Sequence, residues 1–143
     1  MTAGQHETSR FLLVHAGGVD YLLPLGRVRR VLAGLRLFPF PGAAPVVAGL
    51  AEVGGEPLVV LDLGRLAGNH DGVAAGGAVT VVAAVGPSET PEMVGLAVDE
   101  ALDILDIPTA EITRLRDGVV SGEAVAAGRT ARVLDLEAVG WGP

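Results

Sequence analysis

Apolar residues along this chain fall into short runs separated by breaks rich in glycine or proline. The first two runs, Arg10 to Ala16 and Val19 to Leu25, are joined by Gly17-Gly18. A two-residue glycine link supplies the positive φ angles that a tight hairpin turn needs. Val46 to Val53 and Pro57 to Leu63 flank a second Gly-Gly pair in the same way. The pattern therefore predicts two β-hairpins in the first half of the chain.

The second half continues the pattern, and the prediction is about nine or ten short strands in all. Its apolar or alternating stretches lie at 78–85, 93–98, 102–107, 119–126 and 130–134. Residues 37–45 and 68–77 are rich in proline or glycine and are predicted as loops, whereas 27–32 fits a strand or a helix. Asp135 is placed to cap a short terminal helix through Val139. No long helical pattern alternates with the strands, so we predict an all-β fold. No convincing sequence repeat is evident, although this does not exclude two barrels of similar size.

Composition narrows the possible functions. Half of the 143 residues are apolar, the net charge is −7, all ten basic residues are arginine, and only 3% are aromatic. Such a chain lacks the basic stripe and the stacking residues of a nucleic-acid binder, and its charge disfavours an anionic membrane surface. It has no cysteine. Residues 1–9 are polar and predicted to be a disordered tail, and no apolar run approaches the ~20 residues that span a bilayer, so a cytoplasmic protein is expected.

Candidate catalytic groups are scattered. His6, His15 and His70 show no spacing typical of metal ligands, and no serine lies in a nucleophile-elbow motif. Acidic pairs are best explained as solvated faces: Glu52/Glu56, Asp99/Glu100 and Asp103/Asp106. We therefore predict no catalytic, cofactor or metal site, and a protein that is not an enzyme.

Four ordered motifs resemble those of the CheW family of chemotaxis coupling proteins. The first is Tyr21-Leu22-Leu23-Pro24 followed by Val28-Arg29-Arg30-Val31. The second combines the segment from Gly49 to Gly55 with the segment Val59-Val60-Leu61-Asp62-Leu63 that follows shortly after it. The third and fourth are the segments at 94–101 and 133–137. Together the motifs cover most of the chain.

The resemblance implies two intertwined, five-stranded, SH3-like β-barrels with a short C-terminal helix. A single domain over 10–140 is expected, with the boundary between its halves near 68–78 and the N-terminal strand as a candidate for sharing with the second half. The implied role is a scaffold without cofactors that links the cytoplasmic tip of a chemoreceptor to the regulatory domain of a CheA-type histidine kinase. The protein would be a monomer in isolation and a member of a ring or array in the complex, recruited to receptor arrays without inserting into the membrane.

The resemblance and the charge pattern also nominate partner-binding residues. Three of the ten arginines lie within Arg27 to Arg30, which indicates either an exposed strand face or a docking patch of matched charge. Gly49 suits a bulge, or a close backbone approach to a neighbour. The full set of candidates is Val28, Arg29, Arg30, Gly49, Val53, Gly54, Gly55, Glu56, Val98 and Asp99.

Two positions depart from the family pattern. Gly54 stands where the family has an arginine associated with partner contact, and Val59 stands where it has a proline. A divergent adaptor that binds a receptor or a dedicated regulator, but grips the kinase weakly, is therefore an alternative. A small ligand-binding barrel or enzyme is the alternative from another class.

Overall fold

The fold was established from a computed structural model, which describes residues 7–69 and 77–140. These residues form an all-β fold, as predicted, with short helical turns at Leu25–Arg27, Leu63–Leu66 (α1), Thr109–Glu111 and Leu136–Ala138. The strands are β1 (Thr8–Ala16), β2 (Val19–Pro24), β3 (Val28–Ala33), β4 (Val47–Val53), β5 (Glu56–Asp62), β6 (Val79–Val85), β7 (Glu92–Val98), β8 (Glu100–Pro108), β9 (Thr113–Asp117), β10 (Val120–Ala126) and β11 (Arg129–Leu134).

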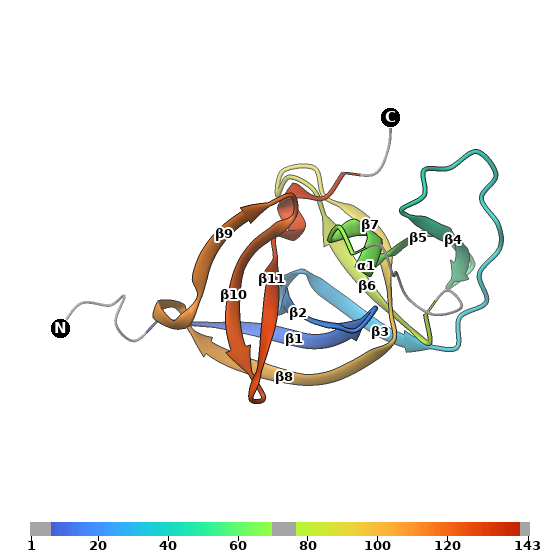
Figure 1. Ribbon diagram of the computed structural model, residues 1–143. Coiled ribbons are helices and arrows are strands. Elements are labelled where there is room, and N and C mark those ends of the chain that lie inside the picture. Colours follow the sequence, from blue (N-terminus) through green and yellow to red (C-terminus); the bar gives the residue numbers. More distant parts are fainter. Residues whose placement is uncertain (1–6, 70–76, 141–143) are drawn as a thin grey trace.

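The strands form two curved, mixed sheets that pack side by side (Figure 1). Sheet A has six strands in the order β8-β1-β2-β11-β10-β9, and sheet B has five in the order β3-β6-β7-β5-β4. Neighbours in each sheet are antiparallel except for one parallel pair, β2 with β11 in sheet A and β5 with β7 in sheet B. The edges of the sheets are therefore β8 and β9 in sheet A, and β3 and β4 in sheet B.

The two halves of the chain exchange hairpins. The β1–β2 hairpin comes first in the sequence but pairs with β8 and β11, whereas the β6–β7 hairpin pairs with β3 and β5. Each sheet is thus completed by two strands from the other half. The hairpin turns follow the glycine pattern, since Gly17 and Gly18 have φ of 57° and 81°.

The exchange reflects an internal repeat, and the expectation of no sequence repeat is wrong. Residues 49–63 and 122–136 align without a gap and cover β4–β5 and β10–β11. Both segments end in Val-Leu-Asp-Leu, and in each the aspartate accepts a hydrogen bond at the start of a helical turn, from Arg65 N in one and from Glu137 N in the other. The segments between these hairpins have diverged, so the repeat is not conspicuous in the sequence.

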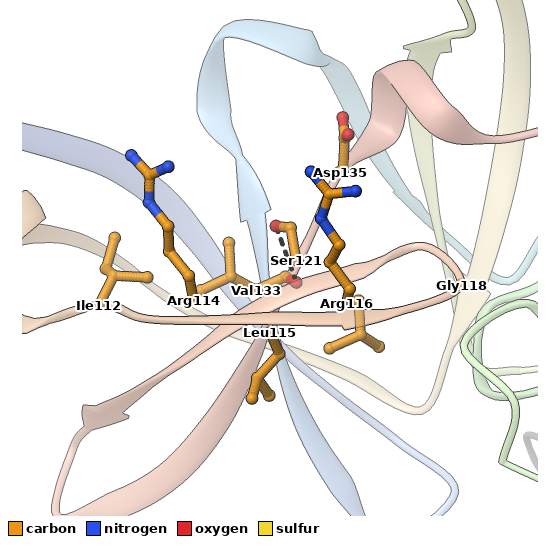
Figure 2. Close-up of a pocket in the computed structure, with 9 residues that line it drawn as sticks. Ile112, Arg114, Leu115, Arg116, Gly118, Ser121, Val133 and Asp135 are labelled. Atoms are coloured by element: carbon orange, nitrogen blue, oxygen red, sulfur yellow. Dashed lines mark hydrogen bonds between the residues drawn. The ribbon is translucent and has the colours of Figure 1, made fainter.

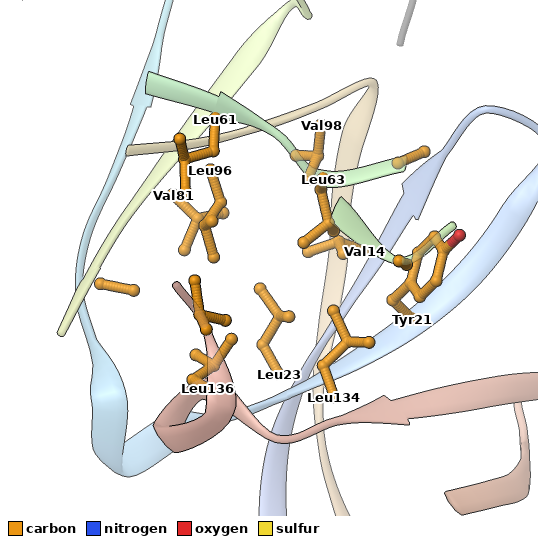
Figure 3. Close-up of a cluster of buried hydrophobic side chains, with 14 of the residues drawn as sticks. Val14, Tyr21, Leu23, Leu61, Leu63, Val81, Leu96, Val98, Leu134 and Leu136 are labelled. Carbon is orange, nitrogen blue, oxygen red and sulfur yellow. The ribbon is translucent and has the colours of Figure 1, made fainter. Parts of the chain in front are cut away.

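Three apolar clusters hold the fold together. One is formed by side chains of sheet A and includes Phe11, Leu22 and Val133. A second is formed by side chains of sheet B and includes Leu58, Val60 and Val82. The largest lies between the sheets, where Leu23, Leu61 and Leu134 converge (Figure 3). Strands β1 and β2 contribute to both the sheet A cluster and the central one, so side chains on both of their faces are buried. Their sequences are continuous apolar runs for that reason.

Some element boundaries differ from the prediction. Strand β1 begins at Thr8, so the last residues of the predicted tail belong to the sheet, while residues 1–6 lie outside the described part. The ambiguous segment 27–32 is mainly the strand β3, and the C-terminal helix is a single 3-10 turn. Strand β9 was not predicted, because only one of its five residues, Leu115, is apolar. Most of the predicted loop at 68–77 also lies outside the described residues.

Candidate partner-binding surface

The arginine cluster lies on β3, at one edge of sheet B. Arg29 and Arg30 are exposed, and Val28 is half-buried against the central core. The Arg29 guanidinium donates to the Gly26 carbonyl at 2.6 Å, whereas Arg30 has no hydrogen-bonding or ionic partner among the described residues. Val31 beside them is 47% exposed. The strand therefore presents two cations and an apolar side chain at an open sheet edge.

Arg27 has a different role from its neighbours. Its guanidinium donates to the carbonyls of Ala84 at 3.2 Å and Gly86 at 2.8 Å, and to the Ser88 hydroxyl at 3.0 Å. These contacts fasten the turn before β3 to the end of β6. Arg27 is consequently occupied within the chain, and the charge available to a partner comes from Arg29 and Arg30.

The second group of candidates forms the β4–β5 hairpin. Gly54 and Gly55 have φ of 60° and 82°, as in the type I′ turn that suits a two-residue hairpin. A Cβ atom added to either glycine would meet nothing within 4 Å, so the tip projects freely. Glu56 is exposed, but Val53 is half-buried and packs on the sheet B core. The tip thus offers mainly backbone and the Glu56 carboxylate.

Gly49 makes its close approach within the chain. It follows a bulge in β4, where the register with β5 shifts between Val47 and Gly49. A Cβ atom here would lie 2.7 Å from the carbonyl oxygen of Phe38, which pairs with Leu50. The absence of a side chain at Gly49 therefore lets the segment around Phe38 extend sheet B.

Val98 and Asp99 also serve the interior of the molecule. Val98 is fully buried in the central core. The Asp99 carboxylate accepts from the Gly17 amide at 2.9 Å, and the Asp99 amide donates to the His15 carbonyl at 2.9 Å. These bonds tie the β1–β2 hairpin to the link between β7 and β8.

The candidates consequently do not form one patch. Gly49 and residues 53–56 share the β4–β5 hairpin at one edge of sheet B, and residues 28–30 lie at the opposite edge. Val98 is buried in the central core, and Asp99 lies at the link between β7 and β8. Two separate exposed surfaces result, one at each edge of sheet B.

Sequence inspection missed a polar cluster on sheet A. The Asp20 carboxylate, buried on β2, contacts His15 Nδ1 at 2.7 Å and accepts from Arg129 Nε at 2.9 Å. Burial alone would raise the pKa of Asp20, but the hydrogen bonds from Arg129 and His15 outweigh it and hold that pKa below its ordinary value. The available signal was a lone charge inside the apolar run from Val19 to Leu25.

A second missed feature is a hollow of about 760 Å³ beside the β9–β10 hairpin, on the face of sheet A that also carries Ile112 and Val133 (Figure 2). Arg114, Arg116 and Ser121 line it. Ser121 was considered in the sequence only as a nucleophile, and the strand that carries the two arginines was not predicted. Across residues 7–69 and 77–140 there is no cluster of three side chains suited to a metal ion. Within the same ranges, no helix has the length and apolar character needed to cross a membrane.

Comparison with known proteins gives one family and one fold. The family model described as a CheW-like domain matches residues 10–140. Among solved structures, the scaffolding protein TtCheW from Thermoanaerobacter tengcongensis superposes with a TM-score of 0.77 at 15% sequence identity, covering 91% of this chain and 90% of that one. No curated protein matches the chain in sequence.

Proposed function

The chain belongs to the family of CheW-like domains, and from this premise we propose that it is a non-enzymatic adaptor that couples chemoreceptors to a CheA-type histidine kinase. The observation that carries the proposal is the family match over residues 10–140. The fold shared with a CheW scaffolding protein supports it. The expected location is the cytoplasm, at receptor arrays.

The geometry of sheet B suits an adaptor. A scaffold needs two surfaces that can be occupied at once, and the β3 edge and the β4–β5 tip lie at opposite ends of one sheet. Edge strands present unpaired backbone groups that another chain can engage. We propose that one of these surfaces binds the receptor and the other binds the kinase. The β3 edge would bind the more acidic of the two partners, because Arg29 and Arg30 make this edge positively charged.

A divergent adaptor with a weak grip on the kinase is the second candidate. The observation that favours it is the β4–β5 tip, where Gly54 projects no side chain into open space. The arginine that the family associates with this position would supply a rigid, multi-donor fork. The two candidates differ only in how tightly the tip binds a kinase regulatory domain.

Binding measurements with purified partners test the proposal. We expect the chain to bind the cytoplasmic fragment of a receptor and the regulatory domain of a CheA-type kinase from the same genome, and to form a ternary complex on size exclusion. Binding to the receptor alone would support the divergent adaptor. Failure to bind either partner in the micromolar range would contradict the coupling role and the receptor-binding form of the divergent adaptor, and would leave only binding to a dedicated regulator.

A further inference from the structure

The hollow on the β9–β10 hairpin lies on sheet A and outside both surfaces proposed above. Arg114 and Arg116 are both exposed and line the same hollow, because they are two residues apart on one strand (Figure 2). Leu115 between them packs against the central core. Two residues apart along a strand corresponds to roughly 6.5–7 Å.

The two guanidiniums are unneutralised among the described residues. Neither takes part in a hydrogen bond or an ion pair there, whereas Arg10, Arg65 and Arg129 each pair with an aspartate. Asp135 also lines the hollow, where its carboxylate accepts from the Glu137 amide, so the two arginines and this aspartate together carry a formal net charge of +1. Two like charges on one strand face, in a chain with a net charge of −7, form a local anion-attracting surface.

The backbone beneath the arginines is bulged. Ser121 is the extra residue of β10, since the register with β11 shifts between Val120 and Gly122. Its hydroxyl lies toward the hollow and makes only a long contact, at 3.4 Å, with the Val133 carbonyl (Figure 2). Bulges commonly re-aim side chains beside functional sites.

The internal repeat shows that the bulge does not require these polar groups. The repeat aligns Ser121 with Ala48, beside the bulge of β4. Gly122 lies against the Thr113 carbonyl as Gly49 lies against that of Phe38, so Arg114 and Arg116 correspond to Pro39 and Pro41. The corresponding β-bulge in the first half of the chain is therefore formed without charged residues at the positions of Arg114 and Arg116.

We propose that this hollow is a docking site for an acidic, extended segment of a partner protein. Strand β9 is an edge of sheet A, and within the described residues its backbone pairs only with β10. A segment added along it would place alternate side chains on the hollow's face, at the spacing of Arg114 and Arg116. The segment recognised therefore carries two acidic residues separated by one other residue. The two guanidiniums and the Ser121 hydroxyl would donate hydrogen bonds to their carboxylates.

A second copy of this chain fits the site less well. The acidic strand β8, the other edge of sheet A, carries Glu100, Asp103 and Asp106, which are three residues apart and so do not match the two-residue spacing of Arg114 and Arg116. Asp106 is also bound to Arg10 at 2.8 Å. The spacing thus favours a different protein as the partner.

Peptide binding tests the proposal independently of the receptor and kinase. The probes are fluorescent 12-residue peptides with a central Glu-Val-Glu, its Gln-Val-Gln counterpart, and an equally charged Glu-Val-Val-Glu. We expect the first to bind most tightly and to shift the amide NMR signals of residues 113–121. Arg114→Gln with Arg116→Gln should weaken it about tenfold, from two cross-strand ion pairs.

Arg36→Gln with Arg132→Gln removes the same charge from exposed positions outside the hollow and outside both proposed surfaces, and is the matched control. It should leave peptide binding unchanged, and both double variants should retain the wild-type melting temperature. Equal binding of the two acidic peptides, loss of binding in the control variant alone, or no binding at millimolar peptide would overturn the proposal. So would a self-association of the wild type, seen by sedimentation, that the Arg114/Arg116 variant abolishes, because the occupant would then be a second copy.

Discussion

At the scale of single residues, Gly54 shows how the repeat informs a substitution. Its φ of 60° is left-handed, and a non-glycine residue there is strained by roughly 1–2 kcal/mol. The equivalent residue of the other hairpin is Ala127, whose φ is 53°. This turn therefore tolerates a side chain at its first central position.

We accordingly expect Gly54→Arg to fold with a melting temperature only a few degrees lower, while restoring the family arginine at an open tip. An interface hot spot contributes about 2 kcal/mol, or roughly thirtyfold in affinity. Titration of the variant with a CheA-type regulatory domain, alongside a thermal melt, measures both effects. Unchanged affinity in a folded variant would remove Gly54 from the binding surface.

The buried Asp20 carboxylate is a second residue whose effect can be measured. Asp20 is only 4% exposed, and Arg129 is its main hydrogen-bonding partner. Removing Arg129 leaves this buried carboxylate without that partner, which lowers the free energy of unfolding by about 1–3 kcal/mol. We expect Arg129→Gln to lower the melting temperature by several degrees. The exposed pair of Arg10 with Asp106 is the control, and Arg10→Gln should leave the melting temperature nearly unchanged.

The same carboxylate predicts a pH dependence. Because the folded pKa of Asp20 is lowered, its stabilisation is present above the unfolded value of about 3.9 and is lost as the pH falls through the folded pKa. Urea unfolding between pH 7 and pH 2 should show this loss in the wild type and a smaller one in Arg129→Gln. Parallel curves for the two proteins would contradict the assignment.

At the scale of elements, the two bulges depend on glycine for steric reasons. A Cβ atom at Gly122 would lie 2.8 Å from the Thr113 carbonyl oxygen and 2.9 Å from Ile112 Cγ2. Gly122→Ala should therefore push β9 away from β10 and destabilise the protein by about 1–3 kcal/mol. Gly26→Ala, where a Cβ atom meets nothing within 4 Å, is the control for a glycine replacement. Equal stability of the two variants would show that β9 adjusts without cost.

The β3 edge gives a prediction about association rate. Charged groups at the rim of an interface act mainly on the rate of encounter, and salt screens them over about 8–10 Å. Arg29→Glu with Arg30→Glu should slow association with the more acidic partner at low salt, and added salt should narrow the difference. Stopped-flow kinetics across a salt series checks this. A wild-type rate at low salt would mean that the two arginines are only a solvated face.

Elements were predictable from sequence where local chemistry defines them. The Gly-Gly pairs mark both hairpin turns of the first half, and the apolar runs mark the strands that are buried. Strand β9 could not be predicted, because a solvent-facing edge strand needs only Leu115 to anchor it. The hollow depends on that strand and on a bulge at Ser121, so it could not be predicted from the sequence either. Arg29 and Arg30 could be nominated as a docking patch because clustering of charge is a local signal, and their role in binding stays a prediction.

At the scale of the whole molecule, the hairpin exchange could not be inferred from local pattern. The parallel pairs of β2 with β11 and of β5 with β7 join strands that lie far apart in the sequence. No turn chemistry specifies such pairs, and only burial on both faces of β1 and β2 hints at them. The exchange makes the two sheets mutually dependent, because each is completed by strands from the other half of the chain.

This dependence predicts the behaviour of the separated halves. Residues 1–69 contain β1–β5 and residues 77–143 contain β6–β11, so each fragment would expose one hairpin and the strands that receive the other. The central core draws Leu23 and Leu61 from one fragment and Leu96 and Leu134 from the other. We expect each fragment alone to lack a cooperative thermal transition, and an equimolar mixture to restore one together with the β-type circular dichroism of the intact chain. The mixture's melting temperature should rise with concentration, since folding has become bimolecular. A fragment that melts cooperatively by itself would show instead that one sheet is stable without the exchanged hairpin.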